Sequence, residues 1–222
     1  MQTRLEPQRV KQLLTQARFY YEYRDIVRLQ LEIVDAVRVV AELSSPTPPL
    51  VFSNAAKTVS LVFMNDFVDI RSSEETLENR KETLRKCLKK LAIRTNILSL
   101  TAMDLRFVSA LVFGEEVDTL EVCKKLFIDE LKIDEVPWSQ PKGVTLKISF
   151  DDENISFGLI IGAVEPNGRK LHVDLQARSQ PISEGIASPE RWNAVLDSLW
   201  TATLSKQSSC IAAATSLVSR RI

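Results

Sequence analysis

The clearest periodic pattern lies in the C-terminal half of the chain. Between residues 144 and 150, apolar and polar side chains alternate strictly, which is the period of a half-buried β-strand. A turn-forming acidic segment follows at 151–154, and an apolar run returns over 155–164. An Asn-Gly pair at 167–168 favours a tight hairpin turn, after which residues 171–176 alternate again. These patterns predict a three-strand antiparallel meander.

Three other segments have the features of helices. Residues 73–95 carry leucines in one stripe, glutamates at the start, and lysines and arginines at the end, which suits the helix dipole. Residues 116–132 show a second helical pattern. A further helix is predicted to begin at Ser188, an N-cap residue, with Pro189 in the first helical position.

The first 43 residues are ambiguous between helix and strand. Residues 6–18 place their apolar side chains on one side of a short helix. The aromatic segment 19–23 favours a strand, and the alternation and β-branched residues over 26–43 favour two strands. One long helix over 6–43 is the alternative.

The order of these elements predicts an α+β fold. One or two strands are expected within 50–70 and another over 97–113, whose mixed alternation indicates a bend or bulge near Ser109. There is no regular alternation of strands and helices. We therefore predict a mainly antiparallel sheet, including the C-terminal meander, covered on one face by two to four helices.

The same elements suggest one domain followed by a short tail. Residues 1–206 form the predicted α+β domain, with possible subdivision at the proline-containing segments 44–49 or 136–143. Residues 207–222 are rich in serine and alanine and are expected to be weakly ordered.

Composition narrows the possible functions. The 222 residues include 29 Lys+Arg and 29 Asp+Glu, so no overall field attracts nucleic acid or a membrane surface. A single histidine excludes metal sites that need two imidazoles, and three scattered cysteines form no disulfide framework. The chain begins without an apolar leader and contains no long apolar run. We expect a soluble cytoplasmic protein with no metal and no cofactor.

No catalytic motif stands out. His172 and Asp174 share the polar face of one predicted strand, but residues two apart on a strand lie about 6–7 Å apart, which is poor hydrogen-bonding geometry. The six glycines form no phosphate-binding loop. Gly158 and Gly162 lie on one strand face, where close packing of a covering helix is favoured over a ligand. No catalytic residue is assigned, and a non-enzymatic role is favoured while the enzyme question stays open.

A basic block at 80–94 is the most suggestive positive feature. Its candidate phosphate-binding residues are Lys81, Arg85, Lys86, Lys89, Lys90 and Arg94. A positive helix face can contact phosphates. The acidic segment 115–135 offers a protein partner for the same charges, within the fold or across a dimer. A solvated or protein-pairing face is favoured.

These observations favour a non-enzymatic interaction or assembly module that acts as a homo-oligomer through exposed sheet edges. The candidate interface residues are Trp138 in the proline-containing connector and Leu50 and Phe52 after Pro48-Pro49, which are the expected exposed apolar features. Tryptophan is often an interface anchor. The alternative is a nucleic-acid-binding protein that uses the basic block. A second alternative is an enzyme with a carboxylate or thiol site.

Overall fold

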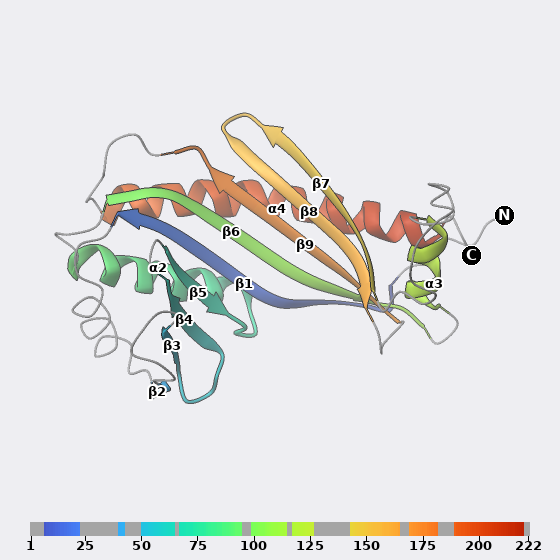
Figure 1. The fold of residues 1–222 in the computed structure, drawn as a ribbon, viewed down its shortest axis with the longest axis horizontal. Coiled ribbons are helices and arrows are strands. Elements are labelled where there is room, and N and C mark those ends of the chain that lie inside the picture. The colour runs from blue at the N-terminus through green and yellow to red at the C-terminus, as the bar shows by residue number, and fades with distance from the viewer. Residues whose placement is uncertain are drawn as a thin grey trace.

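The strands of this protein join into one twisted sheet. The structure, a computed structural model, describes residues 7–22, 40–42, 50–64, 67–94, 99–114, 117–126, 143–164, 169–181 and 189–219. In these segments nine strands form an antiparallel sheet in the order β2-β3-β4-β5-β1-β6-β9-β8-β7 (Figure 1). The predicted α+β class with an antiparallel sheet is confirmed.

The bounds of the strands are β1 Arg9–Glu22, β2 Val40–Glu42, β3 Leu50–Ser53, β4 Val59–Phe63, β5 Phe67–Ser72, β6 Ser99–Val112, β7 Gly143–Asp152, β8 Ile155–Val164 and β9 Lys170–Ser179. The helices are α2 Leu77–Arg94, α3 Thr119–Lys124 and α4 Pro189–Ser219. The strands β7, β8 and β9 pair in sequence order, which confirms the predicted meander.

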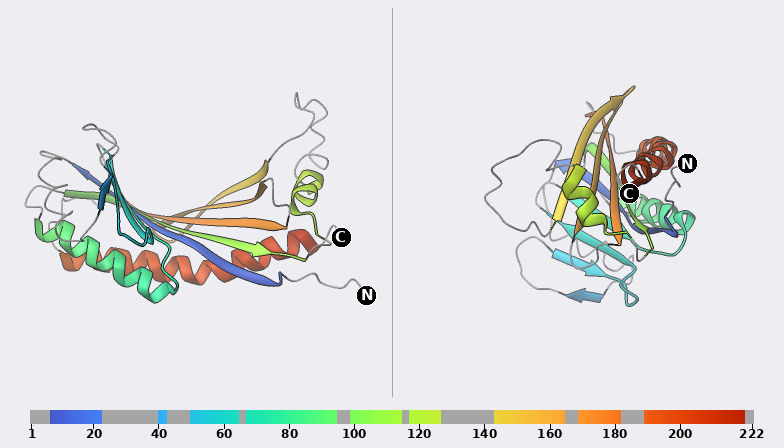
Figure 2. Two further views of the ribbon diagram at one scale, coloured as in Figure 1. Left: turned by 90° about the horizontal axis from the view of Figure 1, so that it is seen from below. Right: turned by 90° about the vertical axis from the view of Figure 1, so that its right-hand side faces the viewer.

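Two long helices cover one face of the sheet. Figure 2 shows α2 and α4 side by side against this face, while the sheet curves so that its opposite face is concave. The core lies between the helices and the sheet, and includes the fully buried side chains of Leu84 and Leu88 from α2 and of Leu196 from α4. Phe107 of β6 meets Trp200 of α4 edge to face, with ring centroids 4.9 Å apart. No described helix combines the length and apolar content needed to cross a membrane.

The N-terminal strand corrects the sequence prediction. The helix expected over 6–18 is wrong, because Arg9–Glu22 forms strand β1 between β5 and β6. The register with β6 shifts between Gln12 and Leu14, so Leu13 is an additional residue in β1. An additional residue changes the phase of a two-residue alternation. The apolar positions on its two sides therefore acquire the three- and four-residue spacing of a helix.

The same bulge explains the irregularity predicted near Ser109. Ser109 lies opposite Gln12, directly beside the register shift, but β1 rather than β6 carries the additional residue. The side chains of Gln12, Ser109 and Gln207 then form a hydrogen-bonded network between the sheet and α4. The Gln207 amide donates to Gln12 Oε1 at 2.6 Å and to Ser109 Oγ at 3.0 Å. Ser109 is thus a polar residue at a core-facing position of β6, and its hydrogen-bond partner is Gln207 of α4.

The C-terminal helix is longer than the sequence suggested. α4 continues to Ser219, and Cys210, Ala214 and Val218 are buried against the core. Residues 207–219 are therefore helical and packed rather than a weakly ordered tail. The apolar face of α4 changes from large to small side chains along its length, which weakens its pattern in the sequence. The suggested subdivision at 44–49, and residues 136–142 of the other suggested boundary, lie outside the described residues.

Candidate functional site

The concave face of the sheet carries a row of alternating charges. The residues directly opposite one another on neighbouring strands are Asp69 of β5, Arg18 of β1, Asp104 of β6 and Arg178 of β9. We call these four residues the charged row. Their neighbours along each strand are buried on the helix side, so strand alternation turns all four toward the concave face.

Arg18 is held in a fixed position by Asp69. Its Nε donates to Asp69 Oδ1 at 2.6 Å and its Nη2 donates to Oδ2 at 3.1 Å, so the two side chains form a bidentate ion pair. The guanidinium also lies 4.0 Å from the centre of the Phe67 ring. The hydrogen bonds to Asp69 raise the pKa of Arg18 further above its ordinary value. This arginine is therefore always charged and has little conformational freedom.

Asp104 is a buried acid in the middle of the row. Its Oδ2 accepts hydrogen bonds from Tyr20 Oη at 3.0 Å and from Gln176 Nε2 at 3.1 Å. Its Oδ1 lies 3.5 Å from Arg178 Nε without a hydrogen bond. Burial raises the pKa of Asp104 above its ordinary value, against the opposing effect of Arg178.

A second arginine–aspartate pair lies beside the charged row. Arg106 of β6 donates from Nε to both carboxylate oxygens of Asp174 on β9, at 2.8 and 2.9 Å, and also from Nη2. These hydrogen bonds raise the pKa of Arg106. Arg106 lies opposite Gln176 and Gln16, so two amides flank its guanidinium.

The acids lie beneath the arginines on this face. The Asp69 and Asp104 side chains are 2% and 4% exposed, whereas those of Arg18, Arg106 and Arg178 are 32%, 42% and 53% exposed. A partner molecule therefore meets mainly N–H donors. The carboxylates below orient these donors and offset part of their charge.

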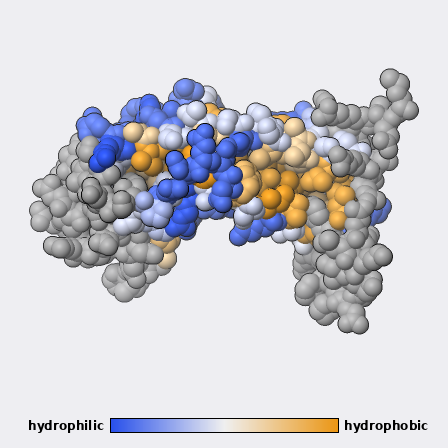
Figure 3. Space-filling view, turned by 90° about the horizontal axis from the view of Figure 1, so that it is seen from above, coloured by the Kyte–Doolittle hydropathy of each residue, from blue (hydrophilic) through white to orange (hydrophobic). Residues whose placement is uncertain are grey.

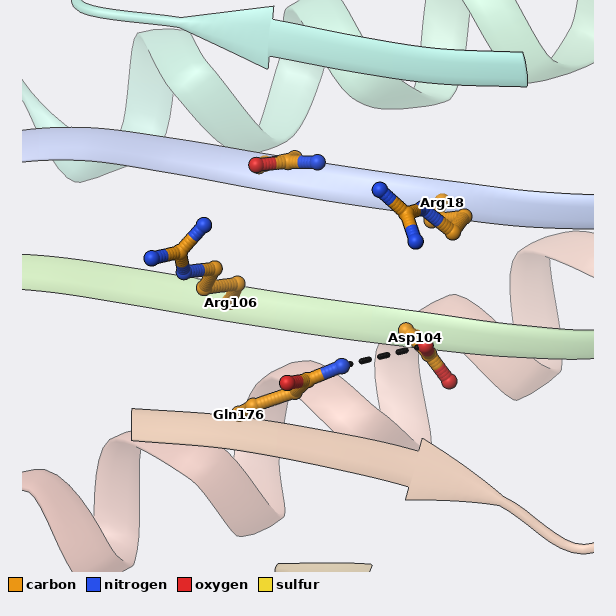
Figure 4. A pocket seen from close by; sticks show the side chains of 5 residues that line it. Arg18, Asp104, Arg106 and Gln176 are labelled. Carbon is orange, nitrogen blue, oxygen red and sulfur yellow. Dashed lines mark hydrogen bonds between the residues drawn. The ribbon is translucent and has the colours of Figure 1, made fainter. Parts of the chain in front are cut away.

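A small polar pocket opens between the two arginine–aspartate pairs. It has a volume of about 120 Å³ and is lined by Gln16, Arg18, Asp104, Arg106 and Gln176. Figure 4 shows the labelled side chains around one opening, with Gln176 hydrogen-bonded to Asp104. Pockets that enclose whole small-molecule ligands measure about 300–1,000 Å³. This pocket is therefore sized for one functional group, such as a carboxylate.

A wider hollow continues from this pocket toward β7. It has a volume of about 400 Å³, and its lining includes Gln176 and Arg178 of β9, Gly158 of β8 and Lys147 of β7. Apart from its chain neighbours, no described residue has an atom within 4 Å of where a Cβ on Gly158 would be, so this glycine leaves open space on the concave face.

The role expected for the two glycines is wrong in one respect. Gly158 and Gly162 share a strand face, as predicted, but they face away from the covering helices. A Cβ on Gly162 would overlap Thr145 Cγ2 of β7 and lie 2.8 Å from the Val144 carbonyl oxygen. Gly162 therefore permits close strand contact, and Gly158 helps to shape the hollow.

His172 and Asp174 both face the concave side, as the alternation predicts. Asp174 is hydrogen-bonded to Arg106, and burial and Lys170 lower the pKa of His172. The thiols are buried as well. Burial raises the pKa of Cys123 to about 11 and also raises the pKa of Cys210. These protonated thiols lack the activation that a cysteine nucleophile needs.

Part of the basic block is engaged inside the fold. Asp197 of α4 accepts a hydrogen bond from Arg85 at 2.7 Å and lies 3.0 Å from Lys81 Nζ. Burial raises the pKa of Asp197, but Arg85 and Lys81 outweigh this effect and the pKa is lowered. Arg80 is buried and donates to backbone carbonyls of Glu74 and Gln12.

The other charges of the two blocks that the structure describes have local partners or lie in solvent. Lys86 Nζ lies 3.6 Å from Glu82, and Lys89 is exposed. In the acidic segment, Asp118 caps α3 and Glu121 pairs with Lys124. Lys90 and Arg94 lie in α2, but their side chains are outside the described part of the structure. Residues 115–116 and 127–135 are also outside it.

The candidate interface residues are placed only in part. Leu50 and Phe52 belong to strand β3, and the structure does not describe their side chains. Trp138 lies outside the described residues.

Sequence reasoning assigned no role to Arg18, Asp69 or Arg106. Arg18 and Asp69 are 51 positions apart, and Arg106 and Asp174 are 68 positions apart. Such pairs depend on strand order. A usable signal was present in each strand, because an acid and an arginine recur on the polar side of β6 and of β9.

Comparisons with known proteins add little. No family model matches this chain, and no curated protein matches it. Among solved structures it is similar to "Methanococcus jannaschii TBP", with 14% sequence identity and a TM-score of 0.37 over 91% of this chain and 98% of that chain. So low a TM-score supports neither a shared fold nor a shared function.

Proposed function

We propose that this protein is a non-enzymatic protein-interaction module whose concave sheet face binds an acidic segment of a partner protein. The observation that carries the proposal is the layering on this face, in which buried carboxylates hold partly exposed guanidiniums. The accessible groups are fixed N–H donors, and their natural complement is a surface rich in carboxylate and carbonyl oxygens.

Preorganisation favours such binding. Arg18 and Arg106 each use Nε and Nη2 to hold an aspartate. A planar guanidinium carries further N–H donors beyond this edge. Because these side chains are already ordered, a partner carboxylate binds them at a smaller cost in conformational entropy than it would bind mobile arginines.

The charge balance around the charged row favours a protein over nucleic acid. In this part of the face the cations are Arg18, Arg71, Arg106, Arg178 and Lys147, and the acids are Asp69, Asp104, Asp151 and Asp174. Three further cations, Arg9, Lys11 and Lys170, lie toward one end of the same face. Nucleic-acid affinity grows with the number of phosphates neutralised by unpaired cations. On the alternative surface, helix α2, Lys81 and Arg85 already form ion pairs with Asp197.

The enzyme alternative receives less support from the pocket. Its five lining residues include one carboxylate, Asp104, and none of them is a nucleophile. Asp104 already accepts hydrogen bonds from Tyr20 and Gln176. The pocket is therefore better suited to holding a group than to transforming a substrate.

The proposal is tested by fluorescence anisotropy with labelled hexaglutamate, hexalysine and a thymidine hexanucleotide. We expect hexaglutamate to bind and hexalysine not to bind. The double variant Arg106→Gln/Asp174→Asn removes the Arg106 guanidinium and the buried Asp174 carboxylate together, so neither charge is left without its partner. It should weaken hexaglutamate binding about tenfold or more, since a hydrogen bond to a charged group contributes about 1.5–3 kcal/mol.

Arg191→Gln is the matched control, because Arg191 is exposed on α4 away from the concave face. It should leave binding unchanged, and thermal unfolding verifies that both variants are folded. Equal binding of hexaglutamate and hexalysine would contradict the proposal. Tighter binding of the oligonucleotide, lost on Lys86→Glu and Lys89→Glu, would favour the nucleic-acid alternative instead.

A further inference from the structure

Among the strands that the structure describes, β7 leaves one end of the sheet open. It is the last strand in the sheet order, and all ten of its residues pair with β8 without a register shift. Protective devices for such edges include proline, bulges, very short strands and charged side chains, especially Lys. β7 contains no proline or bulge along Gly143–Asp152, and the charges on its concave side, Lys147 and Asp151, are of opposite sign. Its outer edge is therefore regular enough to pair with another strand.

The alternation along β7 identifies the residues that face this edge. A two-residue turn, Glu153–Asn154, follows Asp152, and Asp152 pairs with Ile155. Such a turn closes on a hydrogen-bonded pair. Antiparallel pairs alternate between bonded and non-bonded, so Thr145, Lys147, Ser149 and Asp151 are non-bonded opposite β8. Their backbone N–H and C=O groups point to the open edge.

Close contact between Gly162 and Thr145 supports the same alternation. Opposing side chains approach most closely in the non-hydrogen-bonded pairs of an antiparallel ladder. Thr145 lies opposite Gly162, and its Cγ2 occupies the space where a Cβ of Gly162 would be. The pair is therefore of the close, non-bonded kind, as the turn requires.

The helix-side face of the same strand is incompletely covered. Ile148 is 41% exposed, while Phe150 and Leu146 are half-buried. α4 crosses β6 and β9, further from this edge. Figure 3 views the molecule from the side of β7 and shows hydrophobic side chains gathered there beside a hydrophilic cluster.

We propose that β7 pairs antiparallel with β7 of a second copy of this chain, about a two-fold axis at Ser149. This register uses the backbone groups of the open edge, because Ser149 would lie opposite the partner's Ser149 as a hydrogen-bonded pair. Lys147 would then lie opposite the partner's Asp151, and Ile148 opposite the partner's Phe150. Each contact occurs twice, as in any two-fold interface.

The charges make this register self-complementary. An axis at Lys147 or at Asp151 would place like charges opposite each other, which destabilises a strand pair. An axis at Ser149 pairs both Lys147 residues with aspartates and joins the two sheets into one. The surface is distinct from the arginine–aspartate pairs of the concave face, so the two proposals stand or fall separately.

Light scattering and sedimentation equilibrium test the proposal. The wild-type chain should be a dimer, and Lys147→Asp and Asp151→Lys should each weaken the dimer about tenfold or more, because each replaces two opposite-charge pairs by like-charge pairs. An equimolar mixture of the two variants should form a heterodimer, since every pair is then opposite in charge. The double variant Lys147→Asp/Asp151→Lys should dimerise again.

Ser149→Pro provides an independent variant. Proline is tolerated on an edge strand where the missing N–H faces outward, so β7 and β8 should remain paired while dimerisation is lost. Thermal unfolding and far-UV circular dichroism show whether each variant is folded. A monomeric wild-type chain would overturn the proposal, and so would a dimer that none of these changes weakens.

Discussion

Single residues on the concave face combine structural and binding roles. The carboxylate of Asp69 bonds Arg18 and also lies 3.3 Å from Arg71 Nη2. Removing one member of a buried charge pair leaves the other without a partner and costs about 3–5 kcal/mol. Substitutions that remove both members are therefore the informative ones for binding.

Asp104 is expected to give the stability of the protein a distinctive pH dependence. Because the pKa of Asp104 is raised in the folded protein, the folded state holds this proton more tightly than the unfolded state. Its contribution to the free energy of unfolding is therefore greatest below the ordinary aspartate pKa and falls as the pH rises through the raised value. Relative to wild type, Asp104→Asn should gain stability with rising pH in urea titrations.

Asp197 provides the opposite control. The pKa of Asp197 is lowered in the folded protein, so its contribution is present above the ordinary aspartate pKa and is lost as the pH falls through the lowered value. Asp197→Asn should therefore lose stability relative to wild type as the pH rises. If the stability of both variants relative to wild type changed in the same direction with pH, the pKa shifts assigned to Asp104 and Asp197 would be contradicted.

The two glycines of β8 should respond differently to substitution. Gly162→Ala forces a Cβ against Thr145 and the backbone of Val144, so we expect a loss of about 1–3 kcal/mol in the free energy of unfolding. Gly158→Ala meets open space and is expected to be neutral or to stabilise by up to about 1 kcal/mol. Chemical denaturation of the two variants measures the contrast, and equal losses would contradict it.

At the scale of elements, the second half of α4 is expected to be integral to the core. Ala214 is fully buried, whereas Ala213 is exposed on the same helix. Ala214→Asp places an unpaired charge in the core and should cost about 3–5 kcal/mol. Ala213→Asp should change stability by only about 0.5 kcal/mol. If both substitutions were silent in urea denaturation, the helix would not be packed there.

Elements with an undisturbed period were predictable from the sequence. The alternation of β7 and the leucine stripe of α2 each report one buried face, and both elements were found. The first part of β1 was predicted as a helix over 6–18 because the bulge at Leu13 breaks its alternation, whereas its aromatic end was expected to be a strand. The candidate site was not predictable in the same way, since a partner such as Asp69 for Arg18 depends on which strands become neighbours.

At the scale of the whole molecule, the curvature of the sheet separates two surfaces. The helices α2 and α4 fill one face, and the concave face presents the charged row (Figure 2). The edge strand β7 lies at the end of the sheet, beyond β8 and β9. The proposed dimer would therefore extend the sheet without covering the Arg18–Asp69 pair.

The spacing of the arginines in the charged row also defines which carboxylates of a partner can bind at the same time. Arg18 and Arg178 are two strands apart, which corresponds to about 10 Å at the usual strand spacing. In a polyproline II segment, every third side chain returns to the same side after about 9 Å. For the proposed acidic partner, carboxylates three positions apart in such a segment would meet both guanidiniums at once, whereas carboxylates at adjacent positions would meet only one.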